Sequence, residues 1–418
     1  MRLHEMADEE MPTPVTWVRK RERTAAALAL SLVGFDTQNP PGHTAEIVDW
    51  IEERLRTWGI ETERVVADSA KPNLVATIPG ESDRTLLFNG HLDTVPYRPG
   101  RWSYDPLGER EGDRIYGRGA EDMKGPIASL LLAARAYAET GTTPPVNVRF
   151  AFVADEETGG EAGTATLLDR GAVDPEACVV TETTSAADRR SVTVAERGKL
   201  WLTLEARGRA AHGSRPMLGV NAIDRLDDAI EACRDSIDGR RLSIDPVLNP
   251  VIEESVDYYA PAVGRETARA MFERPTTNLG TFNGGESINS VPERAVAELD
   301  VRLTPGVDPT EVLAALRDVL DEYDRVSIRD IDSTTGTYEA ADSPIVDPIT
   351  EAARRVTGDR IHRRCASGGS DARLLRNAGV PSVEFGLGIG TAHATNEHTT
   401  VGTIVGNAAV YSLLPLLC

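Results

Sequence analysis

Strand-like and helix-like segments alternate through the first half of the chain, and this alternation restricts the fold more than any other feature. Strand patterns cover 73–80, 85–90, 146–157 and 177–182, and helix patterns cover 24–35, 45–59 and 126–140. Strands that alternate with helices are typical of a largely parallel sheet with helices on both faces. We therefore expect an α/β domain over this part of the chain.

The pattern changes near residue 198. An alternating strand, a helix, two strands, a second helix and a closing strand follow one another over 199–209, 220–237, 277–285, 295–305, 309–324 and 325–331. This order is the split βαβ, ferredoxin-like pattern. Because helix and strand signals resume near residue 345, we expect an inserted domain. The predicted bounds are 1–197 and 333–418 for the α/β domain and 198–332 for the insertion, with 238–275 left unassigned.

The composition is strongly acidic, with a formal net charge of −21 at pH 7. Nearly all positive charge is arginine, because lysine occurs only at positions 20, 71, 124 and 199. Such a surface suggests adaptation to high salt, and an ordinary acidic enzyme is the alternative. In either case the negative field repels polyanions, so we expect no nucleic-acid partner.

The cysteines and the apolar segments indicate where the chain functions. Cys178, Cys233, Cys365 and Cys418 lie far apart, which favours reduced thiols and a cytoplasmic location. No apolar run approaches the roughly 18 residues of a membrane span. The charged first residues predict no signal peptide. We therefore expect no membrane partner.

Histidines and acids follow the predicted strands. They are His91, Asp93, Glu156, Glu157, Glu182 and His393, together with Asp122, which precedes a helix. Each alone would be read as a turn residue or a solvated acid. In open α/β sheets, however, ligands bind outside the carboxyl ends of the strands. The joint occurrence at strand ends favours a metal site.

The residue types indicate the chemistry of that site. Imidazoles and carboxylates without thiolates suit zinc, cobalt or manganese. Two such ions can share a carboxylate and activate a water molecule. The pair Glu156–Glu157 could divide the work, one residue as ligand and the other as general base. Asp93 could hold the other ring N–H of a metal-bound His91.

Six motifs together resemble one known family. They are GHLDTVP (90–96), GRGAEDMKGP (117–126), VADEETGG (153–160), AAHGSRP (210–216), ESINSVPERA (286–295) and AHATNEH (392–398). In this order they resemble the dinuclear-zinc amidohydrolases and metallopeptidases, which include acetylornithine deacetylase, succinyl-diaminopimelate desuccinylase, carboxypeptidase G and aminoacylase. The resemblance extends from about residue 24 to the end. It implies a zinc-peptidase-like catalytic domain that carries an inserted α+β lid and dimerisation domain.

The resemblance also implies two divalent metal ions and their ligands. One ion would be held by His91, Asp122 and Glu182, and the other by Asp122, Glu157 and His393. Glu156 would be the general base and then the acid, Asp93 would orient His91, and the Asp122–Met123 peptide would be cis. Glu182 departs from the family's Gly-Glu-Pro triplet. His398 is an alternative ligand, but His393 leaves Asn396 and Glu397 in register with the family motif.

The resemblance implies further roles outside the metal ligands. His212 would reach the partner subunit's active site and help to hold an oxyanion, Asn289 would lie near the substrate, and Arg302 would pair with a substrate carboxylate. The loop containing Ser367, Gly368 and Gly369 resembles the family's Ser/Gly-rich segment and could also bind a substrate carboxylate. The alternatives are a surface ion pair for Arg302, turn caps for Asn289 and His212, and a plain helix cap at Ser370 or Asp371.

These observations predict a homodimeric enzyme that hydrolyses the amide bond of an N-acyl amino acid in amino-acid biosynthesis. Deacylation of acetylornithine or succinyl-diaminopimelate is the first expectation, and carboxypeptidase or dipeptidase action on a short peptide is the alternative. A non-catalytic relative would have lost the base or a ligand. Glu156 and the ligands are all present, which argues against that class.

Overall fold

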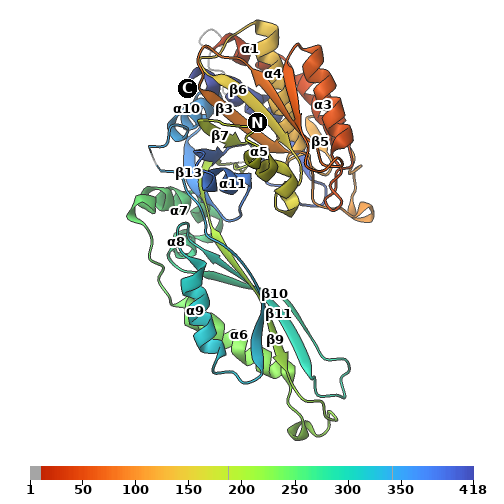
Figure 1. Ribbon diagram of the computed structural model, residues 1–418, viewed down its shortest axis with the longest axis vertical. Coiled ribbons are helices and arrows are strands. Elements are labelled where there is room, and N and C mark those ends of the chain that lie inside the picture. Colours follow the sequence, from red (N-terminus) through yellow and green to blue (C-terminus); the bar gives the residue numbers. More distant parts are fainter. Residues whose placement is uncertain (1–10, 187, 341) are drawn as a thin grey trace. The chain divides into compact units, whose positions relative to one another are not determined.

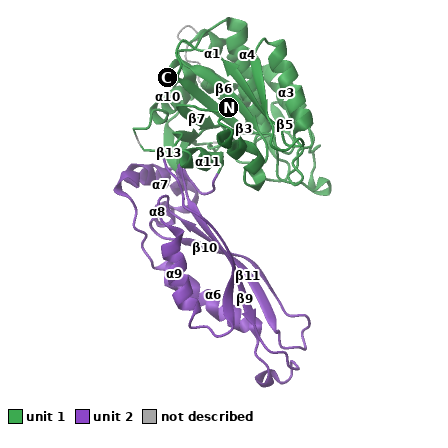
Figure 2. Ribbon diagram, in the orientation of Figure 1, with its two compact units in different colours: residues 1–194, 339–364, 370–418 green, residues 195–338, 365–369 purple. Residues whose placement is uncertain are grey.

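A computed structural model describes residues 11–186, 188–340 and 342–418. It divides into two compact units (Figure 2). Unit 1 comprises residues up to 194 together with 339–364 and 370–418, and unit 2 comprises 195–338 and 365–369. The expectation that the first residues form no signal peptide falls largely on residues 1–10, which lie outside the described ones.

Unit 1 is built on an eight-stranded sheet with the order β1-β2-β6-β3-β7-β14-β8-β13 (Figure 1). The strands are β1 (Glu61–Val65), β2 (Asn73–Ile78), β3 (Thr85–His91), β6 (Asn147–Val153), β7 (Ala177–Val180), β8 (Arg190–Glu196), β13 (Ile361–Ala366) and β14 (Ser382–Glu384). The central strands β6, β3, β7 and β14 pair in parallel. β1, β2 and β6 pair antiparallel, as do β8 and β14. The α/β class is therefore confirmed.

Helices bury both faces of the central strands, as parallel strands require. On β3, Phe88 lies 5.3 Å from Tyr411 and 5.5 Å from Phe150, measured between ring centroids. Leu87 points to the other face and belongs to a cluster with Leu167 and Leu375. The first face packs on α4 (Lys124–Thr140) and α12 (Val401–Leu413), and the second on α5 (Thr166–Asp169) and α11 (Asp371–Asn377) (Figure 1).

The remaining elements of unit 1 surround this core. They are α1 (Thr13–Arg19), α2 (Glu22–Val33), α3 (Ala45–Thr57), α10 (Val346–Thr357), and a small sheet of β15 (His398–Thr400), β5 (Arg114–Tyr116) and β4 (Glu109–Glu111). α3 ends at Thr57, and Gly59, the last residue of the predicted helix 45–59, lies just beyond it with a φ of 74°. Among the described residues, no helix is both long and apolar enough to cross a bilayer.

Unit 2 is an antiparallel four-stranded sheet with the order β10-β11-β9-β12. In chain order its main elements are β9 (Gly198–Arg207), α6 (Ala222–Asp238), β10 (Thr276–Gly284), β11 (Arg294–Leu303), α9 (Pro309–Leu320) and β12 (Val326–Thr334). Leu226 of α6 and Leu316 of α9 pack with Leu202 of β9 in one apolar core. The βαββαβ order and this strand order confirm the ferredoxin-like expectation.

The segment 238–275, which the sequence left unassigned, forms α7 (Asn249–Val263) and α8 (Arg265–Glu273) between α6 and β10. One side of α7 holds Cys365. Ser255 Oγ accepts the backbone N–H of Cys365 at 2.9 Å, and the Tyr259 hydroxyl donates to its carbonyl oxygen at 3.2 Å. This contact explains why 365–369 belongs to unit 2.

Candidate active site

The predicted site residues of unit 1 lie at the carboxyl ends of its four parallel strands. His91 is the last residue of β3, Glu156 and Glu157 follow β6, Glu182 follows β7, and His393 follows β14. Asp122 lies just before α4. Since β6, β3, β7 and β14 are consecutive in the sheet, their carboxyl ends meet at one edge.

Asp122 lies between the two imidazoles. Its Oδ1 is 3.1 Å from His91 Nε2, and its Oδ2 is 3.0 Å from His393 Nε2. Glu182 Oε1 is 3.4 Å from His91 Nε2, and Glu157 Oε1 is 3.4 Å from His393 Nε2. We call His91, Glu182 and Asp122 Oδ1 the His91 side. We call His393, Glu157 and Asp122 Oδ2 the His393 side.

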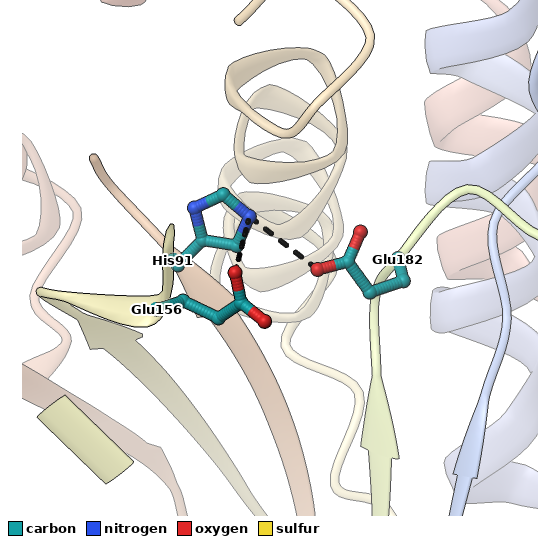
Figure 3. Close-up of side chains that lie close together, drawn as sticks. All are labelled: His91, Glu156 and Glu182. Carbon is teal, nitrogen blue, oxygen red and sulfur yellow. Dashed lines mark ion pairs between the residues drawn. The ribbon is translucent and has the colours of Figure 1, made fainter. Parts of the chain in front are cut away.

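Glu156 points into the same space from the turn after β6. Its Oε2 lies 4.0 Å from His91 Nε2, and Figure 3 shows it with Glu182 around one imidazole. His91, Glu156 and Glu182 each offer a ligand atom within 4.8 Å of the others, and so do His91, Asp122 and Glu157. The geometry therefore permits Glu156 to be a ligand or a base.

Asp93 contacts His91 differently from the simplest expectation. His91 Nδ1 lies 3.0 Å from the backbone carbonyl oxygen of Asp93 and 3.6 Å from its carboxylate. The carboxylate accepts the backbone N–H groups of Glu156 at 3.1 Å and of Glu157 at 3.2 Å. Asp93 thus orients the ring through its backbone and fixes the two glutamates through its side chain.

Sequence reasoning missed Asn39, which supports the same turn. Its buried amide donates to Asp93 Oδ2 at 2.8 Å and to Asp155 Oδ1 at 3.0 Å. Asp155 has a φ of 70°, and it also pairs with Lys71. A non-glycine residue in this conformation needs surrounding contacts to hold it. No signal near Asn39 could have revealed this role, because its partners are distant in sequence.

The charges of the site favour bound cations. Burial alone lowers the pKa of His91, but hydrogen bonds to Asp122, Asp93 and Glu182 outweigh it and raise the pKa well above its usual range. Hydrogen bonds to Asp122 and Glu157 raise the pKa of His393 to about 10. Burial and the nearby Asp122 raise the pKa of Glu182 to about 7.

Glu156 has a perturbed pKa for a related reason. Burial raises its pKa well above the usual range, the nearby His91 opposes this, and the negative charges of Glu182 and Asp122 add to it. A cluster of perturbed carboxylates and imidazoles at a sheet edge is typical of a functional site.

These donors fit a pair of divalent metal ions. Two imidazole nitrogens and several carboxylate oxygens, without thiolates, are ligands that zinc, cobalt and manganese accept. Asp122 presents one oxygen to each side, which is the geometry of a bridging carboxylate. The Asp122–Met123 peptide is cis, as the resemblance implied.

His398 lies apart from the two sides of the site. Its ring packs at a tilt of 31° against Tyr116 with centroids 4.8 Å apart, and its Nδ1 is 3.1 Å from the carbonyl oxygen of Asn396. It is His393, and not His398, whose Nε2 faces Asp122.

The remaining predicted residues lie in unit 2. His212 and Asn289 are on adjoining loops. The backbones of His212 and Ser290 pair in an isolated antiparallel β-bridge, and the Asn289 carbonyl oxygen accepts the N–H of Gly213 at 2.7 Å. Arg302 pairs with Asp300 on its own strand, Nε to Oδ1 at 2.8 Å.

The loop of Ser367, Gly368 and Gly369 is exposed. It leads to Ser370, whose Oγ accepts the backbone N–H of Ala372 at 3.1 Å and caps α11. The helix-cap alternative therefore applies to Ser370.

Two imidazoles and four carboxylates, one of them the Asp122 that faces both imidazoles, lie at the carboxyl edge of an α/β sheet, an arrangement that suits a metal-dependent hydrolase. Comparison with known proteins agrees. The chain belongs to the peptidase family M20/M25/M40, whose family model matches residues 87–416. It is thus an enzyme that acts on amide bonds, as the sequence predicted.

Two curated relatives are similar over most of the chain. The acetylornithine deacetylase of Vibrio parahaemolyticus is 30% identical over 357 residues, covering 82% of this chain and 85% of that one. The succinyl-diaminopimelate desuccinylase of Rhodospirillum centenum is 29% identical over 357 residues, covering 84% and 83%.

A solved structure has the same fold. The M20 family metallo-carboxypeptidase Sso-CP2 from Sulfolobus solfataricus superimposes with a TM-score of 0.77 at 21% identity, covering 94% of this chain and 98% of that one.

Proposed function

We propose that this enzyme is a dinuclear metal-dependent deacylase that hydrolyses the amide bond of an N-acyl amino acid. The observation that supports it most is the position of Asp122, whose two carboxylate oxygens each lie near a different imidazole. His91, Asp122 and Glu182 hold one ion, and Asp122, Glu157 and His393 hold the other. Zinc is the proposed metal, with cobalt or manganese as substitutes.

Glu156 is the proton-transfer residue of this proposal. Its carboxylate lies farther from His91 Nε2 than that of Glu182, at 4.0 Å against 3.4 Å, and it projects from the turn that Asp93 fixes. When bound, the divalent ions supply Lewis acidity that polarises the amide carbonyl and makes a water molecule more acidic. Glu156 accepts a proton from the attacking water and delivers it to the amide nitrogen as the C–N bond breaks. The products are a carboxylic acid and a free amine.

The relatives guide the choice of substrate. Proteins named acetylornithine deacetylase and succinyl-diaminopimelate desuccinylase share about the same identity with this chain. We therefore propose N-acetyl or N-succinyl derivatives of a diamino acid, whose free carboxylate would contact the Ser367–Gly368–Gly369 loop. Arg302 already forms an ion pair with Asp300, so it can bind the substrate carboxylate only when that ion pair breaks.

The proposal includes the assembly and the location of the enzyme. His212 would complete the active site of a second copy, which makes the active form a homodimer, and Asn289 on the adjoining loop would lie near the substrate. Light scattering that finds a fully active monomer would remove this role. The buried free thiols of Cys178 and Cys233 support a location in a reducing cytoplasm.

A substrate panel tests the function. N-acetylornithine, N-succinyl-diaminopimelate, other N-acyl amino acids and short peptides are assayed with zinc, cobalt or manganese, in low and high salt, with and without chelator. We expect chelator-sensitive release of the amine from one N-acyl amino acid. The exposed Glu81→Gln variant should retain this activity and Glu156→Gln should lose it.

The same panel decides the second candidate, a carboxypeptidase or dipeptidase. The observation in its favour is the fold shared with a metallo-carboxypeptidase over 94% of the chain. Turnover of peptides without turnover of N-acyl amino acids would replace the deacylase proposal. Absence of turnover from folded protein that binds no metal would contradict both.

A further inference from the structure

Glu121, the residue before Asp122, is almost fully buried, with 1% of its surface exposed. Its carboxylate accepts hydrogen bonds from the loop that precedes His393. Oε1 accepts the backbone N–H groups of Ile389 at 2.6 Å and Gly390 at 2.8 Å, and Oε2 contacts the N–H and the hydroxyl of Thr391. A buried carboxylate is costly unless donors satisfy it, and here four neutral donors from one short loop do so.

The loop that Glu121 holds has a conformation that needs support. His393 and Asn396 have φ values of 62° and 58°, which side chains other than glycine rarely adopt. The Thr391 hydroxyl accepts the backbone N–H of His398 at 3.1 Å, so Thr391 closes the loop around His393. Since Thr391 also contacts Glu121, the same carboxylate anchors the loop from outside.

A second buried carboxylate, that of Glu397, belongs to the loop of His393 and binds the segment that contains Glu121. Glu397 Oε1 accepts the backbone N–H groups of Glu121 and Asp122, both at 2.9 Å, and its Oε2 pairs with Arg118. The two glutamates therefore form a reciprocal clasp, in which each side chain holds the backbone of the other's segment. The clasp joins the Asp122 segment to the loop of His393, whose side chains meet at 3.0 Å.

The side chain of Glu121 acts on one side of the candidate metal site, because all four of its donors belong to the loop of His393. His393 stands on the clasped loop, whereas His91 is the last residue of β3 and its ring is held by the backbone carbonyl oxygen of Asp93. We propose that Glu121 is a positioning residue that sets the metal affinity of the His393 side and leaves that of the His91 side unchanged. This inference rests on the proposed dinuclear site.

Glu121→Gln tests it with little change of shape. A glutamine keeps one acceptor oxygen, but its NH₂ group would face the Thr391 N–H, donor against donor. Chelator-treated full-length protein is titrated with Zn²⁺ in a calorimeter. We expect one equivalent to bind as in the unmodified protein and a second equivalent to bind about 10–100-fold more weakly, the range usual for partners of metal ligands. Excess Zn²⁺ should restore kcat.

Two further variants complete the test. Thr391→Val removes the hydroxyl and keeps the backbone donors, so it should weaken the second equivalent by a smaller factor, and it serves if Glu121→Gln does not fold. Glu81→Gln, an exposed change of the same chemistry, should alter neither equivalent.

The outcomes distinguish failure of the proposed role of Glu121 from failure of the proposed dinuclear site. Unchanged binding of both equivalents in folded Glu121→Gln, or equal weakening of both, would overturn the positioning role. If the unmodified protein binds only one equivalent, the dinuclear site fails and the inference fails with it.

Discussion

The two imidazoles that face Asp122 have unlike surroundings. His91 ends a central strand and has 1% of its side chain exposed, whereas His393 stands on a loop and has 53% exposed. One backbone carbonyl orients the ring of His91, while the loop of His393 depends on the reciprocal clasp. The candidate site therefore combines a His91 side that is built into the sheet with a His393 side that is contributed by a loop distant in sequence. The four predictions that follow test this contrast.

Asp122→Ala should have the largest effect, because Asp122 belongs to both sides. We expect loss of both metal ions and a fall in kcat/KM larger than the roughly 100-fold typical of outer partners of ligands. Metal analysis of purified protein and steady-state kinetics measure this, with the exposed Asp83→Ala as control. Retention of one tightly bound ion would show that the two sides are independent of Asp122.

Glu156→Gln should lower turnover strongly while both metal ions stay bound. A glutamine cannot accept the proton of the attacking water, so kcat should fall by about 10²–10⁴-fold, the usual contribution of a general base. Metal analysis of the same sample should find two ions. Loss of the ion on the His91 side would instead identify Glu156 as a ligand, as its position beside His91 and Glu182 permits.

The histidines should differ in what they contribute to metal-free stability. His91→Ala leaves buried partners without a hydrogen bond and should lower the free energy of unfolding by about 2–3 kcal/mol. His393→Ala removes a half-exposed side chain and should change it by about 0.5 kcal/mol or less. Urea denaturation with chelator present measures the free energy of unfolding of both variants. Equal losses would contradict the proposed difference between the two histidines.

The rate of metal release should show the smallest of these effects. Because His393 is exposed, we expect the ion on its side to leave about tenfold faster in excess chelator, equivalent to a barrier lower by about 1.4 kcal/mol. Cobalt-loaded protein followed by absorbance should give two phases, and Glu121→Gln should accelerate only the fast one. A single phase would count against two unlike sides.

The sequence predicted most of the architecture because its signals are local. The apolar runs that became β3, β6 and β7 lead directly to His91, Glu156 and Glu182, and the rule that ligands bind at the carboxyl ends of parallel strands predicted that these residues meet. The order of strand and helix patterns over 199–331 was enough to predict a ferredoxin-like unit. The order of the quoted motifs added the cis peptide after Asp122, which no local pattern indicates.

What the sequence missed depends on contacts across the fold. α7 was not predicted because Pro250 and Pro261 obscure its periodicity, although both lie within the helix. Asn39 and Glu121 look ordinary in sequence, since the groups they bind lie on distant segments. The ion pair of Arg302 with Asp300 was locally visible, because residues two apart on a strand share a face.

The interrupted course of unit 1 affects when the enzyme first becomes competent. Glu121 and Thr391 stand 270 residues apart, and unit 2 is translated between them. A ribosome therefore completes β3, β6 and β7 long before it releases the loop of His393. A nascent chain that ends within unit 2 lacks the second imidazole, so hydrolytic capacity requires synthesis of the loop of His393.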